Sequence, residues 1–110
     1  MQTFDQLLQR IEQEIGQLQF DCPPQSLYEP IRYILSLGGK RIRPVLTLMA
    51  CDLYGSDVRQ AIPAALGLEV FHNFTLLHDD LMDEADKRRN KPTVHKVWNA
   101  NTAILSGDAM

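Results

Sequence analysis

Two aspartates in the segment HDDLMD, residues 78–83, have a spacing that suits a shared cation. On a helix, Asp79 and Asp83 lie four residues apart, so both carboxylates point from one face. Like charges at this spacing repel each other by roughly 0.2–0.5 kcal/mol, which a bound cation would offset. Mg²⁺ takes one or two carboxylates and leaves its other positions to water and phosphate oxygens. The pair predicts a Mg²⁺ site; the alternative is a solvated acidic helix end.

The residues before these acids are mostly apolar. They include Leu66, Leu68, Val70, Phe71, Phe74, Leu76 and Leu77. A helix that is apolar on several faces is expected to be buried, so the carboxylates would emerge at the rim of an apolar interior. His72 lies seven residues before Asp79, on nearly the same stripe. It is either part of the site or a buried, hydrogen-bonded histidine.

Positive charge is concentrated in two clusters, which hold seven of the eleven Lys and Arg residues. The clusters are Lys40, Arg41 and Arg43, and Lys87, Arg88, Arg89 and Lys91. Arg donates bidentate hydrogen bonds to phosphate, and Lys supplies a compact charge. The alternatives are a solvated basic face or a nucleic-acid patch. A net charge of -3 and the neighbouring acids disfavour nucleic acid, whereas a Mg²⁺-diphosphate needs both charge types.

The elements that must position these side chains are predicted to be helices. Apolar spacing and Gly/Pro punctuation indicate helices over about residues 2–20, 26–37, 45–54, 61–83 and 93–110. Gly38-Gly39 ends the second helix, Pro44 suits the first turn of the third, and Ser56 can cap the next. No sustained period-two alternation predicts a strand. We therefore expect an all-α fold.

Composition limits the class of protein further. The 110 residues are 45% hydrophobic and 23% charged, which suits one globular domain. Cys22 and Cys51 give neither a disulfide framework nor metal-ligand spacing. No apolar run approaches the roughly 20 residues of a membrane span, and the N-terminus has no secretory pattern. We expect a soluble cytoplasmic protein, and the helical pattern that continues to Met110 suggests part of a longer one.

Five ordered motifs resemble those of the trans-type polyprenyl (isoprenyl) diphosphate synthases. They are GGKRIRP at 38–44, EVFH at 69–72, LHDDLMD at 77–83, RRNKPT at 88–93 and GD at 107–108. The resemblance extends from about residue 28 to the end, and Asn90 replaces the usual Gly. It implies the N-terminal helices of the isoprenoid synthase (terpenoid synthase) bundle, with 1–110 as part of a single all-α domain. Family members are longer and carry a second Asp-rich motif, so these 110 residues alone are expected to be inactive.

The resemblance also implies a role for each site residue. Lys40, Arg43, His72 and Arg89 would bind isopentenyl diphosphate. Asp79 and Asp83 would ligate Mg²⁺ with support from Asp80, and Arg88 would hold the allylic diphosphate. The metal and Arg88 would stabilise the charge that develops as the allylic C–O bond breaks. The double bond of isopentenyl diphosphate would attack the resulting cation, and diphosphate is a plausible base for the lost proton.

Two aromatic residues bear on product length. Phe74 lies five residues before Asp79 and Phe71 eight before it, so their rings could close the path of a growing chain. An aromatic at Phe74 resembles the pattern of short-chain synthases that make farnesyl or geranylgeranyl diphosphate. The alternative is two ordinary core aromatics.

Two other functional classes fit parts of this sequence. The resemblance implies a homodimer. One alternative is a non-catalytic helical subunit of a heteromeric synthase. A terpene cyclase-like relative is a second alternative, and the set Lys40, Arg43 and His72 argues against it because a cyclase has no second diphosphate to hold.

Overall fold

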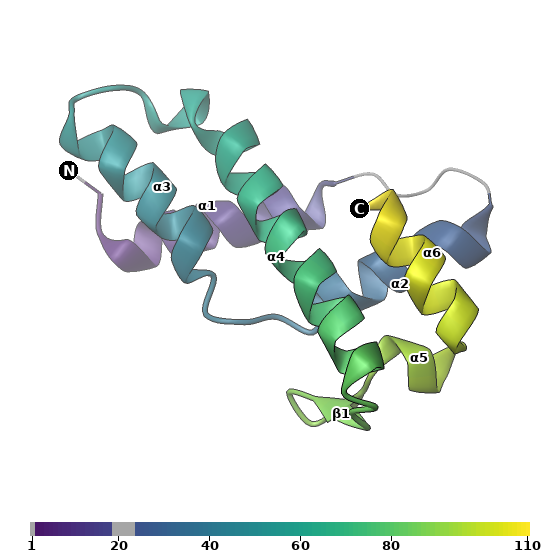
Figure 1. The fold of residues 1–110 in the computed structure, drawn as a ribbon. Helices are drawn as coiled ribbons and strands as arrows, with labels where there is room; N and C mark the ends of the chain where they lie inside the picture. Colours follow the sequence, from purple (N-terminus) through teal and green to yellow (C-terminus); the bar gives the residue numbers. More distant parts are fainter. Residues whose placement is uncertain (1, 19–23) are drawn as a thin grey trace. The chain divides into compact units, whose positions relative to one another are not determined.

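The computed structural model describes residues 2–18 and 24–110, and its regular elements are helices apart from one small hairpin (Figure 1). Its elements are α1 (Phe4–Gly16), α2 (Gln25–Ser36), α3 (Ile42–Leu53), the 3₁₀ helix η1 (Val58–Gln60), α4 (Ile62–Met82), β1 (Lys87–Arg88), β2 (Lys91–Pro92), α5 (Val94–Val97) and α6 (Ala100–Ala109). The all-α expectation is confirmed. Cys22 and most of the expected break before α2 lie outside the described residues.

The described residues fall into two compact units. One unit comprises those of Met1–Leu18 and Gly39–Glu69, and the other those of Gln19–Gly38 and Val70–Met110. Helix α4 contributes residues 62–69 to the first unit and 70–82 to the second. Each unit has its own hydrophobic core.

The first unit is built on the packing of α1 against α3. A capping box starts α1: the Thr3 hydroxyl accepts a hydrogen bond from the Gln6 amide, and the Gln6 side chain accepts one from the Thr3 amide. The buried apolar residues of the core are Leu7, Ile11, Val45, Leu48, Val58, Ile62 and Ala65. Burial of one stripe of α1 matches the three-and-four spacing in its sequence.

The second unit is built on α2, which packs against α5 and α6. Its buried apolar core residues are Ile34, Leu77, Val94 and Ala103. The buried Ser106 hydroxyl donates a 2.7 Å hydrogen bond to the Leu27 carbonyl and thereby ties α6 to α2. As expected, glycine follows α2: Gly38 adopts a left-handed φ of 80°.

The segment after α4 forms a hairpin, so the expectation that no strand is present was wrong. Strands β1 and β2 pair antiparallel, and the turn residues Arg89 and Asn90 have φ values of 50° and 66°. Positive φ at both turn residues is the pattern of a type I′ turn, which fits the twist of paired strands. Asn adopts the left-handed region more readily than most residues. Asn90 can therefore occupy this turn position without a glycine.

Two helix boundaries also differ from expectation. The C-terminal helix is divided into α5 and α6, because the Asn99 side chain caps α6 by accepting a 2.8 Å hydrogen bond from the Thr102 amide. Ser56 does not cap the next element. Asp57 does so instead, by accepting a hydrogen bond from the Arg59 amide of η1.

Helix α4 is less buried than its apolar sequence predicts. Leu68 and Phe71 are 48% and 62% exposed, so the expected burial on several faces is not observed. Its buried positions include the polar residues Glu69, Asn73 and Asp80. Within the described residues, no helix is both long and apolar enough to cross a membrane.

Candidate functional site

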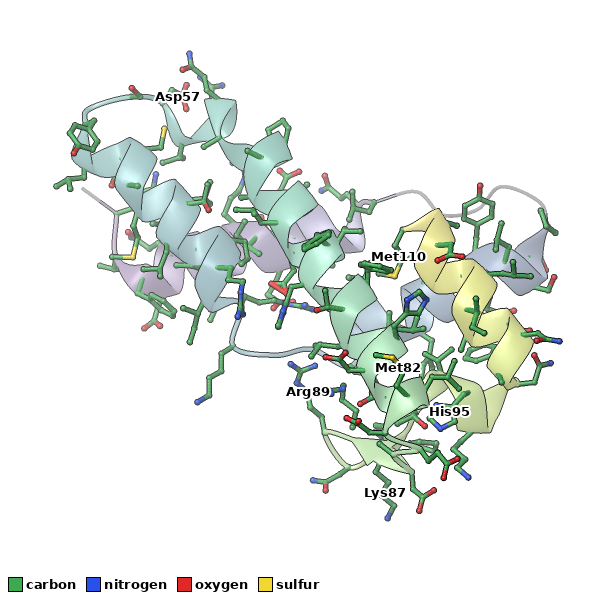
Figure 2. The ribbon with its side chains drawn as sticks, in the orientation of Figure 1. Asp57, Met82, Lys87, Arg89, His95 and Met110 are labelled. Atoms are coloured by element: carbon green, nitrogen blue, oxygen red, sulfur yellow. The ribbon has the colours of Figure 1, made fainter. Side chains whose placement is uncertain are left out.

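The C-terminal end of α4 carries the predicted pair of carboxylates. Asp79 lies in the last turn, and the Asp83 amide donates a 2.9 Å hydrogen bond to the Asp79 carbonyl oxygen. This bond continues the helical turn beyond Met82, which marks the end of α4 in Figure 2. Asp79 and Asp83 are both exposed. Their carboxylates are therefore accessible to a ligand from solvent.

This carboxylate pair fits a divalent ion that takes most of its ligands from elsewhere. Among residues 2–18 and 24–110, no three His, Cys, Asp or Glu side chains are grouped to hold a metal ion. Two accessible carboxylates are nevertheless the donor set that Mg²⁺ commonly accepts from protein when substrate phosphates and water complete its shell. Asp79 and Asp83 are thus the residues that would hold the ion.

The third carboxylate of this segment is bound to an arginine. Asp80 Oδ2 accepts a 2.7 Å hydrogen bond from Arg88 Nε, and Asp80 Oδ1 accepts a second of 2.7 Å from Arg88 Nη2. These hydrogen bonds to Asp80 raise the pKa of the Arg88 guanidinium above its usual value. Partial burial of Arg88 acts in the opposite direction, while the negative charges of Asp80 and Asp79 add to the increase. Only 7% of Asp80 is exposed.

The hairpin carries the second basic cluster and is held in place by hydrogen bonds at its ends. Arg89 lies at its turn and is exposed (Figure 2). The Tyr33 hydroxyl of α2 donates a 2.6 Å hydrogen bond to the Pro92 carbonyl, and the Thr93 hydroxyl donates one of 2.8 Å to the Ala85 carbonyl. These hydrogen bonds hold both ends of the hairpin, and the carboxylates of Asp79, Asp80 and Asp83 take no part in them.

The first basic cluster divides into exposed and buried members. Lys40 and Arg43 are exposed, in the loop before α3 and in its first turn. Arg41 is only 4% exposed; its Nε donates a 2.9 Å hydrogen bond to Glu12 Oε1, and its Nη1 lies 3.6 Å from Glu69 Oε1. Its φ of 54° places it in the left-handed region directly before α3. Arg41 is therefore a structural residue, while Lys40 and Arg43 remain accessible on the first unit.

The remaining predicted residues lie on the part of α4 in the second unit. His72 and Phe74 are partly buried, and Phe71 is exposed. The Phe74 ring lies 5.6 Å from that of Phe71 and 4.7 Å from the imidazole of His78, between ring centroids. Three rings thus follow one another along α4.

His78 connects this aromatic row to α6. Its Nε2 lies 3.2 Å from the Ile104 carbonyl oxygen, to which the Nε2–H tautomer donates, and 3.9 Å from a carboxylate oxygen of Asp108. Gly107 is buried directly against the imidazole. A Cβ atom at residue 107 would overlap the ring.

We expect Gly107→Ala to destabilise the chain by about 1–3 kcal/mol, because the added methyl group forces the His78 ring out of its contact with α6. Urea unfolding measures the change. Gly67→Ala is the matched control: a Cβ there meets no atom within 4 Å, and alanine is the better helix former. Equal stability of the two variants would contradict the expected overlap.

Fold and site together define an all-α protein in which an Asp-rich helix end is joined to an arginine-bearing hairpin. Residues 24–110 match the family model described as polyprenyl synthetase. The chain belongs to this polyprenyl synthetase family.

Individual relatives agree with the family assignment. A geranylgeranyl pyrophosphate synthase from Geoglobus acetivorans is 46% identical over 91% of this chain and 31% of its own length. A geranylgeranyl diphosphate synthase from Methanosarcina mazei is 47% identical over 79% of this chain and 27% of its own length. A crystal structure of a geranylgeranyl pyrophosphate synthase matches 99% of this chain and 33% of that one, with 53% identity and a TM-score of 0.93. The chain spans about a third of the length of these relatives.

Proposed function

We propose that this chain supplies the first Asp-rich site of a prenyltransferase that condenses isopentenyl diphosphate with an allylic diphosphate. The observation that carries the proposal is the joining of two exposed carboxylates and a fixed arginine at one helix end. Family membership and the similarity to geranylgeranyl diphosphate synthases support it. The alternative of a non-catalytic subunit is not favoured, because such a subunit would not need an intact pair of Asp79 and Asp83.

In this proposal Asp79, Asp83 and Arg88 stabilise the negative charge of the diphosphate, the two aspartates through a metal ion. Asp79 and Asp83 would hold Mg²⁺, which when bound would offset negative charge on the diphosphate and make it a better leaving group. Arg88 can donate from Nη1, which its bonds to Asp80 do not use, to the oxygens that gain charge as the allylic C–O bond breaks. The leaving diphosphate can then accept the proton that the product loses, so the reaction needs no side-chain nucleophile.

We assign the second diphosphate to the exposed cations. Lys40 and Arg43 on the first unit, and Arg89 with His72 on the second, are each proposed to bind diphosphate oxygens, since lysine and arginine side chains match phosphate oxygens in charge and hydrogen bonding. We further infer a cytoplasmic homodimer. Its support is the set of exposed apolar residues on and after α3, namely Ile42, Leu46, Leu53 and Tyr54. Sedimentation analysis tests the oligomeric state.

The proposed function is tested with a longer chain of the relatives' length, of which these 110 residues would span about a third. It is incubated with isopentenyl diphosphate, an allylic diphosphate and Mg²⁺. We expect head-to-tail condensation with release of inorganic diphosphate, and loss of both when EDTA removes the metal. Absence of any product from geranyl or farnesyl primers would contradict the proposal.

We expect Phe74→Ala to lengthen the product of that longer chain by at least one isoprene unit. Phe74 and Phe71 are proposed to close the path of the growing prenyl chain, and removal of the Phe74 ring opens the path. Chromatography of the dephosphorylated products measures the effect. Leu68→Ala, at an exposed position of the same helix, is the control; an unchanged spectrum for Phe74→Ala would refute the assignment.

A further inference from the structure

We propose that Glu69 is a positioning residue for diphosphate binding: its ion pair with Arg41 holds the backbone conformation that orients Lys40. The inference rests on the proposed function, which places Lys40 among the ligands of the second diphosphate. Glu69, Arg41 and Lys40 all belong to the first compact unit. The candidate site described above gives Glu69 no role.

The backbone is strained at Arg41, directly after Lys40. Arg41 has a φ of 54° and a ψ of 34°, in the left-handed region. This conformation brings the Cβ atom of an L-residue too close to the following carbonyl oxygen. Gly39 has a φ of 145°, which glycine adopts without that penalty. Lys40 lies between these two residues, so their conformations set the direction in which its side chain leaves the backbone.

Two carboxylates hold the Arg41 side chain in place. Arg41 Nη1 lies 3.6 Å from Glu69 Oε1, and Arg41 Nε donates a 2.9 Å hydrogen bond to Glu12 Oε1. The side chains of Arg41 and Glu69 are only 2% and 5% exposed. Strained residues persist where the surrounding structure fixes them, and they are concentrated at ligand-binding sites. We infer that contacts from α1 and α4 fix the left-handed conformation of Arg41.

The charged character of this pair suits orientation better than stability. Apolar residues of similar volume often stabilise a protein as well as a buried ion pair does. The planar guanidinium differs from them because its donors have a fixed geometry. Arg43 lies in the first turn of α3, where its carbonyl oxygen accepts a 3.0 Å hydrogen bond from the Thr47 hydroxyl. Loss of the Glu69 charge should therefore displace Lys40 more than Arg43.

The variant Glu69→Gln separates positioning from simple electrostatics by the sign of its effect. Glutamine keeps the shape of the side chain and removes its negative charge. If charge alone mattered, loss of a negative charge near Lys40 and Arg43 would strengthen the binding of an anion. If Glu69 positions Lys40 through Arg41, the same variant binds diphosphate more weakly.

The experiment titrates inorganic diphosphate, without Mg²⁺, into the longer chain and follows the amide signals of Lys40 and Arg43 by NMR. We expect Glu69→Gln to lower the affinity by about tenfold, which corresponds to one charge-assisted hydrogen bond. With Lys40→Ala already present, Glu69→Gln should change the affinity by less than about twofold, because the two residues act as one unit.

Glu14→Gln is the matched control for the change of charge. Glu14 pairs with Arg10 on α1, in the same compact unit, with N and O atoms 3.1 Å apart. Its replacement removes the same charge without touching Arg41. We expect diphosphate affinity within about twofold of the unsubstituted chain, since surface ion pairs contribute little.

A second variant keeps the proposal testable if Glu69→Gln folds poorly. Replacing Arg41 with Met and Glu69 with Leu together leaves the net charge unchanged and restores an apolar pair. We expect this double variant to fold, as circular dichroism would show, and still to bind diphosphate about tenfold more weakly. Recovery of binding together with folding would show that the pair has only a structural role.

The condensation assay provides a second readout. We expect Glu69→Gln to raise the KM for isopentenyl diphosphate by about tenfold and to keep kcat and the KM for the allylic diphosphate within about twofold. A merely destabilised variant would contain less active enzyme, which lowers kcat and leaves both KM values unchanged.

The outcomes separate this proposal from the proposed function. Unchanged or tighter diphosphate binding by Glu69→Gln would overturn the positioning role, as would an equal loss of affinity with Lys40→Ala present. Condensation without any response of the Lys40 amide to diphosphate would overturn it and leave the function intact. Failure of the function has the opposite signature: no product forms, yet Lys40 responds to diphosphate and Glu69→Gln weakens that response.

Discussion

Replacement of Asp79 by alanine is expected to lower the condensation rate of the longer chain by about 10²–10³-fold, the usual cost of losing one electrostatic contribution to a charged transition state. The variant retains only one of the two carboxylates that would hold Mg²⁺. Because Asp79 is exposed, the free energy of unfolding should change by less than about 0.5 kcal/mol. Steady-state kinetics and urea unfolding measure the two effects.

Asp86→Ala provides the control for this prediction. Asp86 is an exposed acid in the following loop and pairs with Lys96 across 3.3 Å at the surface. Its replacement should retain most of the activity and stability. If Asp79→Ala instead destabilised the fold as much as it slowed the reaction, Asp79 would have a structural role.

The largest effect on stability is expected from Arg41→Ala, at about 3–5 kcal/mol. Arg41 is 4% exposed and lies between Glu12 and Glu69. The Glu69 side chain is only 5% exposed. Removal of Arg41 therefore takes a neighbouring cation away from a buried carboxylate. Thermal or urea unfolding of the chain measures the loss.

Two further variants test whether the loss of stability comes from the buried charge of Arg41. Lys40→Ala, at the exposed position next in sequence, should change stability by less than about 0.5 kcal/mol. Replacing Arg41 with Met and Glu69 with Leu together should recover part of the loss, because apolar pairs of similar volume often substitute for buried ion pairs. Similar unfolding curves for Arg41→Ala and Lys40→Ala would show that the pair contributes little.

Local sequence patterns predicted the helix that carries the carboxylates of the site. The apolar spacing placed α4 within one residue of each observed end, at Ile62 and Met82. The spacing of Asp79 and Asp83 predicted their shared helix turn, and Gly38 marked the end of α2. These features depend on neighbours within a few positions, which a single sequence displays directly.

The hairpin and the ion pairs could not be predicted in this way. Strands of two residues are too short for alternation, and Arg89-Asn90 is not the usual Asn-Gly turn signal. Arg41 is distinguished from Lys40 only by burial against Glu12, which lies 29 residues earlier. Asp80 and Arg88 meet only because the connection from α4 to β1 turns the chain between them.

The short connection from α4 to β1 determines which side of the strand each side chain of β1 faces. Ala85 donates a 2.9 Å backbone hydrogen bond to Asp80, and Glu84 adopts a left-handed φ of 53°. Adding or deleting one residue here would reverse the alternation of β1 and turn Arg88 to the opposite side of the strand. Natural variation in this family should therefore conserve the length of residues 83–87 more strictly than their identity.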